Sequence, residues 1–126
     1  MLQRIVMYLA RTADFPEGST ARGYEIVAPL DAQGHLDAKA WRKERTRCRV
    51  RRFWAGEPDR IGQLVHRPGG SGGATWTFDY GDRAGEDAEE EGYHLNTHRF
   101  LIGEYVSLRE QGGEPIPFKV ASADPV

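Results

Sequence analysis

The sequence contains a single cysteine, Cys48, among its 126 residues. One thiol cannot form an intrachain disulfide, so the disulfide-stapled folds of small secreted domains are excluded. A chain of this length buries about two-thirds of the surface that its unfolded state exposes, and a core of that size is stable without a metal ion. We therefore expect a domain that folds unaided in the reducing environment of the cytoplasm.

Long apolar runs are absent as well. The run from Ile5 to Ala10 is far shorter than the roughly 20 residues that a membrane-spanning helix needs. The net charge is -2, which gives the chain no general attraction to nucleic acid or to anionic lipid. The sequence therefore predicts no membrane partner.

Local catalytic motifs are also lacking. The sequence has no Gly-x-Ser-x-Gly and no His-Glu-x-x-His, and the glycine-rich run 68–73 lacks the Lys-Ser/Thr ending of a phosphate-binding loop. Parity along the predicted strand turns Cys48 away from the neighbouring arginines, so we expect a buried, inert thiol. These absences favour a non-catalytic protein, and we predict no cofactor.

Glycine and proline recur at short intervals, and the segments between them are rich in β-branched and aromatic residues. This spacing predicts an all-β or β-dominated α+β fold, either a small antiparallel barrel or a strongly bent sheet. One short helix is expected near 37–44, where Asp37 is a good N-cap. The predicted strands are 3–11, 23–29, 45–54, 60–66, 74–80, 93–100, 103–109 and 116–122.

No linker divides the chain. We expect a single β-rich domain over 1–122 and a loose C-terminal tail over 123–126. The alternative is an α+β roll in which more of 82–98 is helical.

The segment 45–54 carries the densest charge. Between residues 42 and 52, seven basic residues accompany one acidic residue. Side chains alternate across a strand, so every second residue would share one face, with neighbours about 6.5–7 Å apart. Such a row of guanidinium groups suits carboxylates or phosphates. The predicted anion-binding residues are Arg45, Arg47, Arg49 and Arg51.

An acidic segment opposes this one. Residues 82–91 include six acidic residues and one basic residue. The segment covers the arginine face, forms a solvated face of its own, acts as a competitor or gate for an anionic partner of the arginine face, or complements a charged protein partner. The sequence leaves these interpretations open.

Two further groups of side chains admit a functional interpretation. Trp76 and Tyr80 share a face of the strand predicted at 74–80, which indicates a core strand or, alternatively, a platform on which bases stack. His94 and His98 have i, i+4 spacing, and Glu104 lies nearby, so a metal site is the alternative to structural or surface roles. On a strand the two histidines would lie about 13 Å apart, which disfavours a shared ion.

The leading functional prediction is a binding module whose arginine face engages an anionic ligand, either nucleic acid or an acidic protein segment. The second is a structural or protein-interaction subunit that forms a homo-oligomer. The third is a metal-dependent enzyme that uses His94 and His98.

Overall fold

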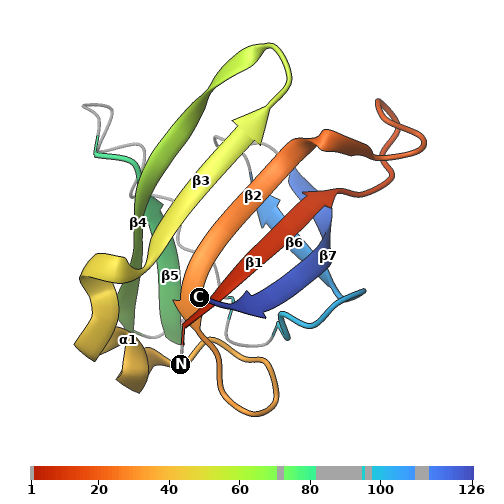
Figure 1. The fold of residues 1–126 in the computed structure, drawn as a ribbon. Helices are drawn as coiled ribbons and strands as arrows, with labels where there is room; N and C mark the ends of the chain where they lie inside the picture. The colour runs from red at the N-terminus through yellow and green to blue at the C-terminus, as the bar shows by residue number, and fades with distance from the viewer. Residues whose placement is uncertain (1, 71–72, 82–94, 96–97, 110–113) are drawn as a thin grey trace.

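The computed structural model describes residues 2–70, 73–81, 95, 98–109 and 114–126. In this part of the chain, seven strands form one antiparallel sheet that curls into a half-barrel (Figure 1). The strands are β1 (Leu2–Leu9), β2 (Ser19–Pro29), β3 (Arg49–Trp54), β4 (Glu57–Gly70), β5 (Gly73–Asp79), β6 (Tyr105–Arg109) and β7 (Pro115–Pro125), in the spatial order β5-β4-β3-β2-β1-β7-β6.

The described residues also include the α-helix α1 (Ala38–Glu44) and the 3₁₀ turn η1 (Arg45–Arg47). The predicted fold class, a strongly bent antiparallel sheet with a short helix near 37–44, is confirmed. Nowhere in the described ranges is a helix long and apolar enough to cross a membrane.

The hydrophobic core fills the concave side of the half-barrel. Alternation along each strand sends apolar side chains inward, as in β2, where Tyr24, Ile26 and Ala28 are buried and Glu25 and Val27 lie on the opposite face. The largest fully buried side chains are Trp76, Phe100, Phe118, Ile5, Met7, Ile26, Leu64, Leu95 and Leu108.

The sequence predictions for residues 98–100 and 123–125 are wrong. Residues 98–100, the described end of the strand predicted at 93–100, are irregular, and Phe100 instead donates its backbone N–H to the carbonyl of Gly34 at 2.8 Å. The predicted loose tail is the end of β7, because Ala123 pairs with Ile5 and Pro125 with Gln3. Residues 123–125 extend β7 because β1 supplies backbone partners along that edge. The low β propensity of this segment alone does not predict a strand there.

Helix α1 is held against one end of the half-barrel (Figure 1). The Oδ1 atom of Asp37 accepts hydrogen bonds from the backbone N–H groups of Lys39 and Ala40, both at 3.1 Å, as its predicted capping role requires. The buried Trp41 donates its indole N–H to the carbonyl of Leu64 at 2.8 Å. This single side chain therefore attaches the helix to strand β4.

His66 lies in the same aromatic cluster. Its ring centroid is 4.6 Å from that of Trp76 and 5.8 Å from that of Trp41. Burial lowers the pKa of His66 below its ordinary value of 6.5, and the positive charge of Arg42 lowers it further. The folded protein therefore holds this imidazole in the neutral form more strongly than the unfolded chain does.

We predict that acidification destabilises the fold through His66. Below pH 6.5 the unfolded chain binds a proton at this site more readily than the folded protein, so the free energy of unfolding falls as the pH drops through this value. Thermal melts between pH 7.5 and about pH 5.5 measure the slope. The variant His66→Gln should have a shallower slope, and an unchanged slope would contradict the assignment.

Gly23 allows two aromatic side chains to meet on the convex face. It pairs with Tyr8 on one side and with Phe53 on the other. Across the glycine, the rings of Tyr8 and Phe53 make an edge contact with centroids 6.1 Å apart. A Cβ at residue 23 would overlap the carbonyl oxygen of Met7 and lie 3.0 Å from Cζ of Phe53.

We predict that Gly23→Ala costs about 3 kcal/mol of unfolding free energy, because a methyl group there must displace backbone atoms. Gly56→Ala is the matched control: Gly56 has φ 88° and open space around it, so only backbone strain of about 1 kcal/mol applies. Urea unfolding of both variants tests this order. An equal loss of unfolding free energy in the two variants would show that the close approach of backbone atoms at Gly23 does not set the cost of the substitution.

Candidate ligand-binding surface

The predicted row of four arginines is divided between two elements. Strand β3 begins only at Arg49, and Arg45 and Arg47 belong to the 3₁₀ turn η1. The chain leaves α1 through this turn, which is closed by a hydrogen bond from the N–H of Cys48 to the carbonyl of Arg45 at 3.2 Å. Period-two alternation therefore starts four residues later than predicted, and the expectation of one continuous guanidinium row is wrong.

The arginines of the turn have local neighbours. The guanidinium carbon of Arg45 lies 5.8 Å from the ring centroid of Trp41, and Arg47 pairs with Glu44 at 3.2 Å. Arg49 is exposed at the start of β3. The three side chains thus lie in different surroundings at the helix end of the sheet.

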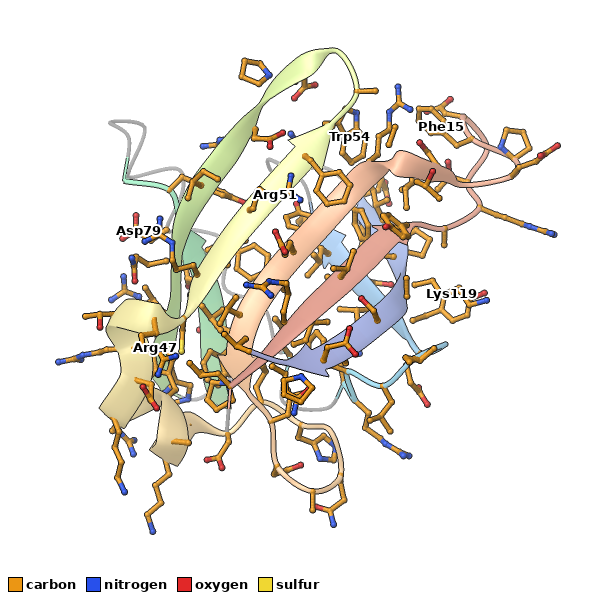
Figure 2. All side chains as sticks on the ribbon, in the orientation of Figure 1. Phe15, Arg47, Arg51, Trp54, Asp79 and Lys119 are labelled. Carbon is orange, nitrogen blue, oxygen red and sulfur yellow. The ribbon has the colours of Figure 1, made fainter. Side chains whose placement is uncertain are left out.

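Arg51 belongs to a charge network on the convex face, where Figure 2 shows it in front of β3. Its guanidinium contacts Glu25 on β2 at 2.9 Å and Asp59 on β4 at 3.0 Å, and Arg4 on β1 contacts Glu25 at 3.1 Å. The hydrogen bond that Arg51 donates to Glu25 is the largest cause that raises the pKa of Arg51. Carboxylates on the two neighbouring strands thus balance the charge of Arg51. The acidic segment 82–91, which was one candidate to cover the arginines, lies outside the described residues.

The two predicted stacking residues differ in burial. Trp76 is fully buried in the core, which leaves no ring face for a base, so the core interpretation is correct for this residue. Tyr80 is half-buried, and the guanidinium carbon of Arg60 lies 4.1 Å from its ring centroid.

Three residues were predicted to form a metal site. One of them, His94, lies outside the described part of the chain. His98 is half-buried, and burial lowers its pKa below the ordinary value, whereas Glu104 is exposed. Among the residues that the structure places, no three His, Cys, Asp or Glu side chains are grouped as metal ligands.

Cys48 is the buried thiol that the sequence predicts. It is inaccessible to solvent, and its Sγ lies 3.4 Å from the carbonyl oxygen of Glu44. Burial raises the pKa of Cys48 to about 11, and the negative charge of Glu44 acts in the same direction. The thiolate form, which is the nucleophile, is therefore rare at neutral pH.

We predict that the native protein resists thiol reagents. At pH 8 about one molecule in a thousand carries the Cys48 thiolate, and the side chain is buried as well. Ellman's reagent should label the protein rapidly only after unfolding in guanidinium chloride. Stoichiometric labelling of the folded protein within minutes would contradict this environment.

An arginine–aromatic cluster closes the end of the half-barrel opposite α1. The guanidinium carbon of Arg22 lies 4.4 Å from the ring centroid of Phe15 and 5.8 Å from that of Trp54, so it joins the β1–β2 loop to the β3–β4 hairpin (Figure 2). Its Nη1 donates to Ser19 at 3.1 Å. Its Nε is buried without a hydrogen-bond partner among the described residues.

Arg52 occupies the other side of Trp54. Its guanidinium carbon lies 4.6 Å from the ring centroid of Trp54, and it pairs with Glu57 at 3.0 Å. The side chain of Arg52 is only 8% exposed, whereas that of Glu57 is 53% exposed. The cluster therefore covers this end of the core with a buried guanidinium whose carboxylate partner faces solvent.

A lysine between two tyrosines lies elsewhere on the convex face. Lys119 on β7 pairs with Tyr8 on β1 and with Tyr105 on β6, so the three side chains share one face. Lys119 Nζ lies 5.7 Å from the ring centroid of Tyr105. Figure 2 shows Lys119 pointing outward from the sheet.

These side chains line a groove of about 630 Å³, which we call the convex groove. Tyr105 is 57% exposed there and Ile102 is 70% exposed, so the groove presents apolar surface to solvent. Two cationic residues and one acidic residue line it. The lining residues are Tyr8, Leu9, Ala10, Arg11, Glu17, Gly18, Ile102, Gly103, Tyr105, Lys119, Val120 and Ala121.

Sequence reasoning missed this groove because its residues come from distant parts of the chain. Alternation in the last hairpin, where Phe118 and Val120 point inward, already indicates that Lys119 points outward. The contact with Tyr8 depends on β7 pairing with β1, which no local pattern reveals.

Comparisons with known proteins add no further evidence: a scan of protein-family models, a search of curated proteins and a search of solved structures gave no match.

Proposed function

We propose that this domain is a non-catalytic binding module that engages an anionic partner in the convex groove. The observation that carries the proposal is the position of Lys119, an exposed cation flanked by two tyrosines in a concave part of the surface. The partner replaces water over apolar surface while its negative charge faces the lysine.

The size and lining of the groove support binding. Ligand sites occupy about 300–1,000 Å³ and combine apolar or aromatic walls with a few polar groups. The convex groove falls within this range, and its walls include Tyr8, Tyr105 and Ile102. Exposed apolar side chains gathered in one place are typical of interaction sites.

The charge of the groove favours an anion. Arg11 and Lys119 contribute two positive charges, and Glu17 contributes one negative charge. By contrast, the predicted site on β3 offers less charge, because Glu25 and Asp59 already neutralise Arg51. The convex groove is therefore the better anion site on this face.

A second candidate function is self-association, favoured by the exposure of Ile102 and Tyr105. A second copy of the chain would cover the same apolar surface. Sedimentation velocity over a range of protein concentrations separates this function from anion binding, because only self-association depends on protein concentration.

We predict that Lys119→Gln weakens binding of polyanions. Inorganic polyphosphate and polyglutamate serve as probes, and binding is followed by ¹H–¹⁵N correlation spectra of the full chain at low salt. The amide signals of Tyr105 and Lys119 should shift on titration, and the variant should bind roughly two- to fivefold more weakly, as expected for the loss of one solvent-exposed charge pair.

Arg49→Gln is the matched control, because it removes an exposed charge from the originally predicted face on β3. It should bind like the parent protein. Loss of binding in Arg49→Gln but not in Lys119→Gln would assign the anion site to β3. No binding of either probe at low salt would refute the proposed function.

A further inference from the structure

We propose that the anionic partner is single-stranded nucleic acid, laid across the strands of the convex face with its bases on aromatic rings. The inference rests on the proposed function and names the class of partner for the same surface. The phosphates lie near Lys119 and Arg11, and a base stacks on Tyr105, whose ring is exposed. The half-buried rings of Tyr8 and Phe53, which meet edge-on, extend the aromatic surface across the sheet.

The register of the sheet aligns these side chains in one row. Phe53 pairs with Gly23, Gly23 with Tyr8, Tyr8 with Lys119, and Lys119 with Tyr105. Residues paired directly across antiparallel strands lie on the same face. We call the rings of Phe53, Tyr8 and Tyr105 in this register the aromatic row. The five neighbouring strands lie about 4.8 Å apart, so the aromatic row extends about 19 Å across the sheet.

Each end of the aromatic row carries a ring next to a cation. At the β6 end, the exposed ring of Tyr105 lies 5.7 Å from Lys119 Nζ. At the β3 end, the guanidinium carbon of Arg51 lies 4.8 Å from the centroid of Phe53. Because two carboxylates already engage Arg51, we assign it to supporting the ring of Phe53 and assign the phosphate contacts to the groove end.

The balance between ring surface and charge favours nucleic acid over an acidic peptide. An acidic peptide gains mainly from charge pairs, and the groove offers only two cations against Glu17. A nucleic acid strand also gains from stacking, which contributes about 1–3 kcal/mol per base. A partner that presents planar faces gains this stacking energy in addition to the burial of apolar surface.

The strand must be single, because a duplex hides the faces of its bases within its own stack. Stacking tolerates any base, so we expect little sequence preference. With two cations near phosphates, the logarithm of the binding constant should fall with the logarithm of the salt concentration at a slope of only about -1 to -2.

The test is fluorescence anisotropy of the full chain with a labelled oligothymidylate of about 12 nucleotides, a length within the range that single-strand-binding domains cover. Tyr105→Ala should weaken binding roughly 5- to 150-fold, as expected for the loss of one stacked base. Tyr105→Phe retains the ring and should bind like the parent protein, as should the control Arg49→Gln. Circular dichroism confirms that each variant is folded.

Two further probes separate stacking from charge. An abasic oligonucleotide keeps the phosphates and lacks the bases, so it should bind at least tenfold more weakly than oligothymidylate, and a duplex of the same length should bind weakly too. Equal binding of the abasic strand, or equal affinities of Tyr105→Ala and Tyr105→Phe, would overturn the stacking inference.

The outcome also distinguishes this inference from the proposed function. If polyglutamate or polyphosphate binds with the predicted dependence on Lys119 and oligothymidylate does not, the groove remains an anion site and nucleic acid is excluded as its partner. If none of the probes binds at low salt, both proposals fail.

Discussion

Strand β1 pairs with β2 along one edge and with β7 along the other, and this double pairing sets the geometry of both faces of the sheet. It places Ile5 and Met7 in the concave core and Tyr8 on the convex face, opposite Gly23 and Lys119. A shift of one residue would exchange the two faces, so burial of the core holds the register of the surface residues as well.

The arginines of the two faces of the sheet have different contacts. On the concave side, aromatic rings and Glu57 accommodate Arg22 and Arg52, which cover the end of the core. On the convex side, the guanidinium of Arg51 is divided between two carboxylates from neighbouring strands. Arg22, Arg51 and Arg52 therefore contact groups of the sheet and its loops, whereas Lys119 on β7 is exposed.

The successful sequence predictions depend on interactions between residues that are close together in the chain. The β-rich fold follows from short alternating segments between glycines and prolines, and the helix near 37–44 from the capping side chain of Asp37. The prediction of a buried Cys48 is correct as well, although the residue ends the turn η1 and lies outside β3. The errors arose where neighbouring elements decide the conformation. Residues 45–47 continue from α1 as a 3₁₀ turn, and residues 123–125 become a strand because β1 offers them backbone partners.

By itself, the sequence determined which side chains alternate and hence which apolar groups must leave water, because those preferences act within a few residues. Only the tertiary structure decided which strands are neighbours. Tyr8 and Lys119 are separated by most of the chain, and they share a groove because β7 returns to pair with β1. Such pairing depends on the combined burial of many distant side chains, and no local pattern encodes it.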